Sequence, residues 1–491
     1  MTKDMTKGKP VKLILEFAIP FLFGLLFQQF YSIVDTMIVG KCLGSNALAA
    51  VGATGSLSFL IIGFCTGVCS GFAIPVAQYF GAKDAHELRR AVGNSAWLSI
   101  LFSVVMSAVT VILCKQFLIW MRTPADIMEQ SYTYIVIIFA GIPATYLYNL
   151  LAGIIRSLGD SRTPVVFLAI ASFLNIVLDL ILIMGCSMGV SGAALATVIS
   201  QAVSGVLCLF YMRRKYAILK MSREEWKWDR DVVRKLCGMG IPMGLQYSVT
   251  AIGSVILQSS VNMLGTMSVA AITAGSKVSI FFCCPYEALG STMATYGGQN
   301  VGAGKLDRIG KGLRAAIGLG FAYSIVALFI LVGCGKELTL LFLNKGDGQI
   351  IAMSYTFLLW NAGAYCLLVL VNTVRFLIQG LGFSVYAIFA GLFEMIARTL
   401  VAFLFVPMLG YTGACMASPL AWLFADLFLI PAYFRCMRIL KKNLSPAAAL
   451  TEEAHQVEEA SFRGQRQESI KNRPSRSKKK HILQHFQYNK A

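Results

Sequence analysis

Charged residues are scarce in this chain of 491 residues. Asp, Glu, Lys and Arg together make up 14% of the sequence, against roughly 25% in ordinary soluble domains, and 57% of the residues are hydrophobic. This composition excludes an ordinary soluble domain and predicts a polytopic membrane protein.

The motifs of enzymes and metalloproteins are also missing. The 13 cysteines show no CxxC spacing and the four histidines lie in a loop or in the C-terminal tail, so neither residue type predicts a metal site. The stretch GQNVGAGKL comes nearest to a phosphate-binding loop, but Gln299 replaces its first glycine and Leu306 replaces its Ser or Thr. We therefore expect no enzyme, no cofactor and no coupling to ATP.

Long apolar stretches dominate the sequence instead. Twelve of them reach the length of about 20 residues that a helix needs to cross a bilayer. Their centres lie near Leu26, Ile61, Met106, Ile138, Leu174, Val203, Val255, Phe282, Ile325, Leu367, Leu400 and Leu423.

The basic residues predict the orientation, because loops on the cytoplasmic side of a membrane are enriched in Lys and Arg. With the N-terminus inside, the exceptions are few: Lys41, Lys115, Arg122, Lys336 and Lys345 fall outside, and Lys277 and Arg398 fall within helices. We expect a multi-pass protein of the inner (plasma) membrane with both termini in the cytoplasm. The net charge of +19 then requires no nucleic acid.

The two halves of the chain repeat one another. LGSNALAAVGA from Leu43 corresponds to LGTMSVAAITA from Leu264, and QYFGAK from Gln78 corresponds to QNVGAG from Gln299, at offsets of 221 to 223 residues throughout. Six spans in each half give both halves the same topology, which predicts an all-α fold of two six-helix lobes related by a parallel repeat. The predicted parts are an N-terminal lobe (1–212), a cytoplasmic linker (213–235), a C-terminal lobe (236–440) and a basic, disordered tail (441–491).

Acidic residues inside the spans point to a site, because each costs about 2.5–3.5 kcal/mol at a helix centre. We identify four: Asp35, Asp179, Glu287 and Glu394. Each aspartate has polar neighbours at helical spacing, and the sixth span adds a polar stripe of its own. These neighbours are Gln28, Tyr31 and Ser32 before Asp35, Asn175 before Asp179, and Thr197 and Gln201 in the sixth span.

Counting residues places Asp35, Asp179 and Thr197 at a similar depth, about 7 to 9 Å below the outer boundary. One shared pocket could then hold a proton or a cation between two carboxylates. The alternative is that both aspartates only hydrogen-bond neighbouring helices.

Further residues are expected along a central cleft or at a moving helix. Pro20 could bend the first span, Gln246 gives the seventh span a polar face, and Glu287 either lines the cleft or bonds backbone freed by Pro285. Glu394 and Arg398 are expected to form an ion pair, because they are four residues apart on one helix.

The sequence resembles the multidrug and toxic compound extrusion family, in particular its bacterial DinF- and NorM-like members. The resemblance covers about residues 10 to 440 and rests on QQFYSIVDTMIVG, GSNALAAVG, FGAKD, RSLGDSRTP, NIVLD and GQNVGAGK. It implies twelve helices, alternating access, and export of organic cations or amphipathic drugs in exchange for H⁺ or Na⁺. It also implies a cation site at Asp35, Asn175, Asp179 and Thr197, and a bending proline at Pro20. The acids that NorM-type members carry in the seventh and tenth spans have no counterpart here.

We therefore predict a cation-coupled antiporter whose partners are a small organic cation or amphipathic substrate and the membrane lipid, with a monomer as the expected state. One rival is a lipid-linked oligosaccharide or polysaccharide flippase, which would favour a strongly basic cleft. Another is a non-transporting membrane receptor or scaffold that acts through its tail.

Overall fold

The computed structural model describes residues 3–121, 123–343 and 346–443, and the side chain of Ser45 is left out. All regular elements in this part of the chain are helices. The predicted basic tail lies outside the described residues, apart from its first three.

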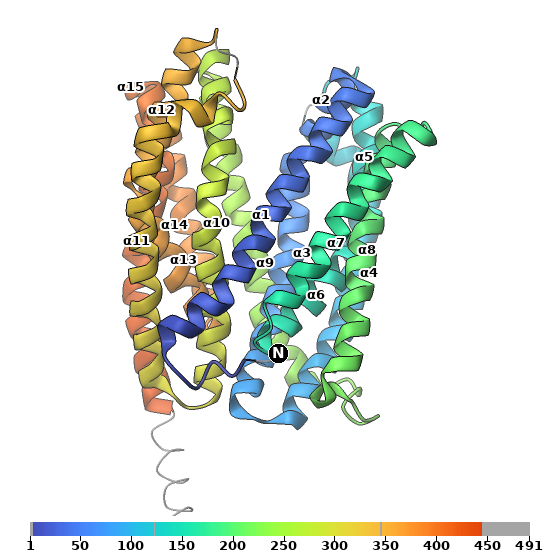
Figure 1. Cartoon of the computed structure of the whole chain (residues 1–491), viewed down its shortest axis with the longest axis vertical. Coiled ribbons are helices and arrows are strands. Elements are labelled where there is room, and N and C mark those ends of the chain that lie inside the picture. Colours follow the sequence, from blue (N-terminus) through green and yellow to red (C-terminus); the bar gives the residue numbers. More distant parts are fainter. Residues whose placement is uncertain (1–2, 122, 344–345, 444–491) are drawn as a thin grey trace, which may run out of the picture. The chain divides into compact units, whose positions relative to one another are not determined.

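The first half contains eight α-helices and a π-helical turn (Figure 1). They are α1 (Pro10–Leu43), α2 (Ser45–Ala53), α3 (Gly55–Ala82), α4 (Ala85–Trp120), α5 (Met128–Ala140), α6 (Ile142–Ser157), α7 (Arg162–Asp179), η1 (Leu180–Gly185) and α8 (Val190–Lys215). A short 3-10 turn, η2 (Ala217–Leu219), follows α8.

The second half repeats this pattern. Its elements are α9 (Arg230–Asn262), α10 (Thr266–Gly302), α11 (Leu306–Thr339), α12 (Gly348–Gly363), α13 (Tyr365–Gly380), α14 (Val385–Leu400), the π-helical turn η3 (Val401–Phe405), α15 (Val406–Leu409), α16 (Tyr411–Cys415) and a further helix, Ala417–Asn443.

The helices fit the predicted number of spans. Ten helices of the described chain are long and apolar enough to cross a membrane, and two bent pairs, α5 with α6 and α12 with α13, bring the number to as many as 12. All twelve predicted centres lie within these helices. The all-helical, two-lobe fold is therefore confirmed.

Glycines break the helices at equivalent places in both halves. Gly44 and Gly265 have φ angles of 87° and 92°, and Gly189 and Gly410 have φ angles of 61° and 57°. Residues with a Cβ rarely adopt this left-handed backbone, so each pair preserves a turn that the repeat requires.

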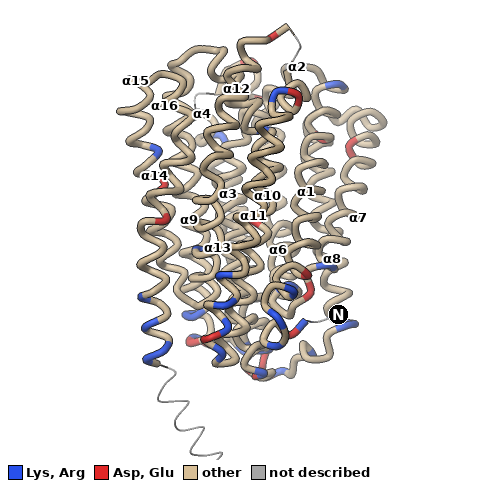
Figure 2. Tube along the Cα trace, turned by 60° about the vertical axis from the view of Figure 1, so that its left-hand side comes forward, with Lys and Arg blue, Asp and Glu red and all other residues tan. Residues whose placement is uncertain are grey.

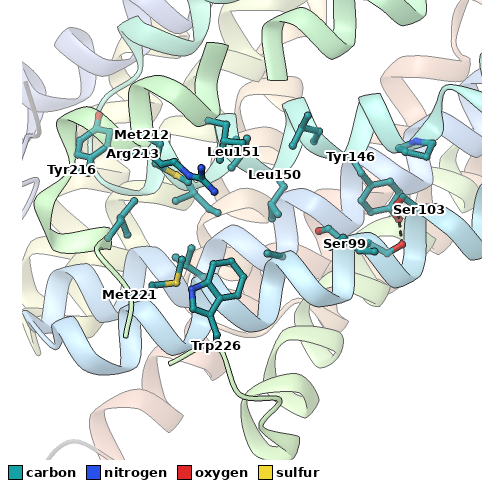
Figure 3. Close-up of a pocket in the computed structure, with 18 of the residues that line it drawn as sticks. Ser99, Ser103, Tyr146, Leu150, Leu151, Met212, Arg213, Tyr216, Met221 and Trp226 are labelled. Atoms are coloured by element: carbon teal, nitrogen blue, oxygen red, sulfur yellow. Dashed lines mark hydrogen bonds between the residues drawn. The ribbon is translucent and has the colours of Figure 1, made fainter. Parts of the chain in front are cut away.

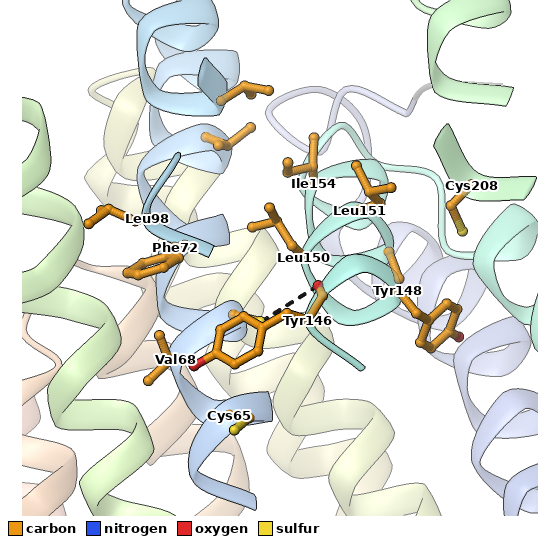
Figure 4. Packing of buried hydrophobic residues seen from close by; sticks show 14 of the residues in the cluster. Cys65, Val68, Phe72, Leu98, Tyr146, Tyr148, Leu150, Leu151, Ile154 and Cys208 are labelled. Atoms are coloured by element: carbon orange, nitrogen blue, oxygen red, sulfur yellow. Dashed lines mark hydrogen bonds between the residues drawn. The ribbon is translucent and has the colours of Figure 1, made fainter. Parts of the chain in front are cut away.

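Apolar side chains from α3, α4, α6 and α8 form the core of the N-terminal lobe (Figure 4). Tyr146 and Phe72 are among its largest fully buried residues. Cys65 and Cys69 pack here as small apolar groups.

The two lobes meet along α3 and α9, where glycines allow the backbones to touch. A Cβ on Gly67 would lie 2.8 Å from the Cα of Gly244, and one on Gly71 would overlap the backbone of Gly240. Small residues at a helix crossing permit this approach, and any larger side chain would push the helices apart.

Hydrogen bonds close the lobes against each other near the end where the N-terminus lies. Gln78 Nε2 donates to the carbonyl of Gly380 at 3.1 Å, and Gln299 Nε2 donates to the carbonyl of Ser157 at 2.8 Å. These donors and acceptors correspond to each other under the internal repeat. We call this reciprocal pair of bonds the lobe seal.

The N-terminal segment before α1 crosses the lobe seal. Met5 N–H donates to Gln299 Oε1 at 2.9 Å, and the Lys305 ammonium donates to the carbonyl of Thr6 at 2.9 Å. Arg308 donates to the carbonyl of Gly8 at 2.9 Å. Met5 and Thr6 are buried, so this segment is part of the packed structure.

Basic residues gather at the same end of the described helices (Figure 2). This distribution agrees with the predicted asymmetry of Lys and Arg. Which side of the membrane this end faces stays a prediction.

We expect Gly67→Leu to destabilise the protein, because the new side chain has to displace the backbone of α9. Overpacking of this kind typically costs about 1–3 kcal/mol. Gly55→Leu on the same helix is the control, since nothing lies within 4 Å of a Cβ there. Thermal unfolding in detergent should show a lower melting temperature for Gly67→Leu alone; equal melting temperatures would contradict the close contact.

Candidate functional site

Two carboxyl groups from different helices meet in the N-terminal lobe. Asp35 lies near the end of α1, and Asp179 is the last residue of α7. The two carboxyl groups are close enough for their charges to interact, and no hydrogen bond joins them. Asp179 is fully buried, and Asn175, one turn earlier on α7, is 1% exposed.

The polar atoms of this pocket lack partners. Asp35 Oδ1, both carboxyl oxygens of Asp179 and both side-chain polar atoms of Asn175 are buried without a hydrogen-bond partner among the described residues. Buried polar groups are nearly always hydrogen-bonded, so these atoms can still bind a partner that the described residues do not supply. Two facing carboxylates have no hydrogen to donate and need a shared proton or a cation between them.

A π-helical turn begins directly after Asp179. Such turns are rare, and many occur at functional sites. The C-terminal lobe has the equivalent turn, η3, directly after Leu400, but without an acidic residue before it. The turn therefore belongs to the repeated fold, while the carboxyl pair belongs to one lobe.

Thr197 is on α8, which packs against α7, and it lines a cavity beside these helices. Its hydroxyl donates to the carbonyl of Ala193 at 3.1 Å, which leaves its oxygen free to accept a bond or to bind a cation. Tyr31 and Tyr134 line the same cavity and lie near both carboxyl groups.

The cavity has a volume of about 610 Å³ and is lined by both lobes. Of the predicted residues, it brings together Gln28, Tyr31, Ser32, Thr197, Gln201 and Glu287. Tyr247, Glu287 and Phe376 line it from the C-terminal lobe, so it lies between the lobes. We call it the central cavity.

The central cavity contains one basic and one acidic side chain that face it, Arg156 and Glu287. Neither forms an ion pair with another described residue. The Arg156 guanidinium lies 5.1 Å from the centre of the Phe21 ring. Arg156 also lines a smaller pocket of about 60 Å³, together with Ser70, Ser157 and Thr295.

Two predicted residues lie away from the central cavity. Gln246 is buried between α9 and α13, where its Oε1 accepts a hydrogen bond of 2.6 Å from Gln379 Nε2. It therefore holds helices together and does not face the cleft, because burial demands a partner for its amide. Pro20 lies inside α1, which continues through it as one helix.

Comparison with known proteins identifies the family. The MatE family model matches residues 20–181 and again residues 242–404, so the two matches coincide with the two halves of the repeat. The chain belongs to the MatE family. These are the multidrug and toxic compound extrusion transporters that the sequence resembles.

Curated MatE relatives are named as transporters or resistance proteins. The probable multidrug resistance protein YoeA of Bacillus subtilis is 29% identical over 343 residues, which cover 68% of this chain and 74% of YoeA. The FAD transporter of Shewanella oneidensis is 23% identical over 301 residues, which cover 60% of this chain and 66% of that protein.

Solved MatE structures share the fold. A MATE protein in complex with MaL6 has a TM-score of 0.84 at 21% identity, covering 90% of this chain and all of that one. An outward-facing MATE transporter has a TM-score of 0.83 at 22% identity, covering 89% of this chain and 98% of that one.

A second charged cluster lies in the C-terminal lobe of this MatE protein. Glu394 Oε1 accepts a hydrogen bond of 2.8 Å from Arg375, and Glu394 Oε2 lies 3.7 Å from Arg398. The expected pair of Glu394 and Arg398 is present, but Arg375 makes the shorter contact. Asp426 is 3% exposed and interacts electrostatically with Arg375 and Glu394.

Three charged residues of the helices escaped the sequence prediction, namely Arg156, Arg375 and Asp426. Asp426 is three residues from Leu423, the predicted centre of the twelfth span, so position alone could have identified it. Arg375 also lies within the tenth span. Arg156 is in α6 because the fourth span is a pair of helices bent by 45°, which a straight window of about 20 residues misses.

We expect Arg375→Met to destabilise the protein strongly. Removal of one partner from a buried ion pair typically costs about 3–5 kcal/mol, and replacement of both partners costs far less. The double variant with Glu394→Met should therefore melt at a higher temperature than Arg375→Met. Lys12→Met is the control, because Lys12 lies 4.0 Å from Glu16 in an exposed pair. A double variant less stable than the single one would show that the pairing does not matter.

Proposed function

We propose that this protein is a secondary antiporter that exports organic cations or amphipathic drugs in exchange for H⁺ or Na⁺. The observation that carries the proposal is the facing pair Asp35 and Asp179, whose buried oxygens have no donor among the described residues. An entering proton or sodium ion satisfies these oxygens, with Asn175 and Thr197 completing the shell. Carboxylate, amide and hydroxyl oxygens are hard ligands that suit either ion.

The position of the pair suggests how the ion acts on transport. Tyr31 lies four residues before Asp35 on α1 and lines the central cavity, so a change at Asp35 reaches the cavity through one helical turn. A bound cation draws α1 and α7 together, and an empty pair repels. An ion that binds two arrangements of α1 unequally shifts the equilibrium between them. Pro20 gives α1 a point at which it can bend, because it removes one helical hydrogen bond.

Transport also requires the central cavity to open alternately to the two sides of the membrane. The lobe seal closes the protein at one end, and the central cavity lies between the lobes. An antiporter has to break these bonds and close at the other end, which rotation of two similar lobes achieves. With both termini in the cytoplasm, the closed end is the inner one.

The rival functions predict different sites. A flippase for phosphate-linked lipids favours a strongly basic cleft, whereas the charged residues of the central cavity are one Arg and one Glu. A scaffold would act through the tail, and a chain truncated after residue 443 would then lose its function. The antiporter requires only the two lobes.

We expect Asp35→Asn and Asp179→Asn each to abolish ion-driven transport in proteoliposomes. The assay follows a fluorescent organic cation under a Na⁺ gradient and, separately, under a pH gradient. Either substitution removes one of two charges that hold the ion, so the response to the active gradient should disappear. An entering charge gains about 2.3 kcal/mol per 100 mV, so a membrane potential should also drive the wild type.

Asp307→Asn is the matched control, because Asp307 lies in the first turn of α11, outside the pocket. It should respond to the gradients like the wild type. Gradient-driven transport that survives in both pocket variants would refute the assignment of the coupling site.

The two charges of the central cavity suggest its substrates. Glu287 is exposed in the cavity and attracts a cationic group, while Arg156 can bind an anionic group of the same molecule. The aromatic residues Tyr31, Tyr247 and Phe376 supply ring faces for an amphipathic body. In the C-terminal repeat Gln379 stands where the N-terminal half has Arg156, so the fold does not demand arginine at this place.

We expect Arg156→Gln to weaken binding of an anionic probe selectively, and Glu287→Gln to weaken binding of every cationic probe. Tetramethylrhodamine carries a carboxylate and its methyl ester does not, so the two probes differ in one charge. Arg156→Gln should raise KM for the acid about tenfold, since hydrogen bonds to charged groups contribute about 1.5–3 kcal/mol. It should leave KM for the ester unchanged, whereas Glu287→Gln should raise KM for both probes. Equal effects of Arg156→Gln on both probes would exclude Arg156 as an anion-binding residue.

A further inference from the structure

A second large pocket lies in the N-terminal lobe, away from the central cavity (Figure 3). It has a volume of about 570 Å³ and is lined by α4, α6, the end of α8 and the segment that follows α8. No residue lines both this pocket and the central cavity. The helix α6 separates them: Tyr146 and Leu150 face this pocket, while Tyr148 and Asn149 face the central cavity.

The walls of the pocket suit an acyl chain, and its length matches the thickness of one lipid leaflet. Its walls are mostly apolar, and Ile100 and Val104 are 56% and 57% exposed at its edge. Its lining on α4 runs from Val92 to Val104, about 18 Å at roughly 1.5 Å per residue. Half of a hydrocarbon core about 30 Å thick has nearly the same depth.

Two cationic side chains, Arg213 and Lys220, line the pocket. Figure 3 shows Arg213 beside Met212 and Tyr216. Arg213 is near the end of α8, and Lys220 follows the turn η2. Both residues are exposed, and neither is paired with an acid among the described residues. Figure 2 shows that basic residues gather at one end of the helices, which is the distribution expected where a protein meets anionic headgroups.

The segment that closes this end is held in place. Arg89 pairs with Glu225 at 2.6 Å, and Trp97 Nε1 donates to the carbonyl of Trp226 at 3.0 Å. Arg90 pairs with Asp229, whose carboxylate also accepts the N–H groups of Val232 and Asp231.

These contacts hold the pKa of Asp229 below its ordinary value, with the bond from Val232 as the largest cause. The pair of Arg90 and Asp229 is therefore ionised at neutral pH. Met221 and Trp226 lie on either side of Glu225 in the sequence, and both line the pocket (Figure 3).

We propose that this pocket binds one acyl chain of an anionic phospholipid, with the lipid phosphate between Arg213 and Lys220. The apolar walls exclude a charged or strongly polar occupant, and the two unpaired cations favour an anionic headgroup over a zwitterionic one. Basic pockets between membrane helices recognise anionic headgroups by the same chemistry. Because α6 forms a wall of both spaces, the lipid supports the helix that carries Arg156 and Asn149 to the central cavity.

The test compares lipid retention of three proteins by native mass spectrometry, after purification with equal amounts of phosphatidylglycerol and phosphatidylcholine. The wild type should retain phosphatidylglycerol in clear preference. Arg213→Gln with Lys220→Gln should lower this preference about tenfold or more, since each cation near an anionic lipid contributes measurably. Arg214→Gln with Lys215→Gln is the matched control: it removes the same charge from adjacent exposed residues that do not line the pocket.

A second variant tests the acyl-chain site. Ala96→Phe fills the apolar part of the pocket and should reduce retention of both lipids while leaving Arg213 and Lys220 in place. Three results would overturn the proposal: equal retention of both lipids by the wild type, wild-type preference in the Arg213 and Lys220 variant, or an equal loss in the control variant. Lipid retention needs no transport, so it is independent of whether the protein is an antiporter.

Discussion

The contact of backbone with backbone between the lobes is the constraint on which the rest of the structure depends. Gly81 of α3 packs against the backbone of Gln299, and Gly302 of α10 packs against the backbone of Gln78. These two contacts correspond to each other under the internal repeat, as do the hydrogen bonds of the lobe seal. A larger residue at either glycine would displace the backbone of the facing helix. The central cavity is lined by other parts of α3 and α10, away from these contacts.

The two halves share their helix arrangement, but they differ in the positions of their charged residues. The positive φ glycines, the π-helical turns and the lobe seal occur in both halves, whereas the facing carboxyl pair occurs only in the N-terminal lobe. The C-terminal lobe has buried charges of its own: Glu394 is paired with two arginines, and Asp426 is buried near them without a hydrogen bond to its carboxyl oxygens. Asp35 and Asp179 have no arginine beside them among the ion pairs of the described residues. The two halves therefore share one fold but differ in their electrostatics.

Much of this arrangement could be predicted from the sequence. Hydropathy predicted the spans, the constant offset between repeats predicted the two lobes, and helical spacing predicted the polar faces of α1 and α7. The features that were missed depend on helix bends and on contacts between helices. Arg156 was missed because the fourth span was treated as straight. Gln246 was expected along the cleft because its partner, Gln379, is 133 residues away in the sequence. The π-helical turn after Asp179 has no sequence signal that periodicity can detect.

The N-terminal segment described with the fold has a mechanical consequence. It is continuous with α1, which packs against α7 of the N-terminal lobe and against α10 of the C-terminal lobe. Its backbone is bonded to Gln299, Lys305 and Arg308 of the C-terminal lobe. This segment therefore ties the start of α1 to the C-terminal lobe. Any rotation that parts the lobes at this end has to break these bonds, so residues 3–9 help to hold this end closed.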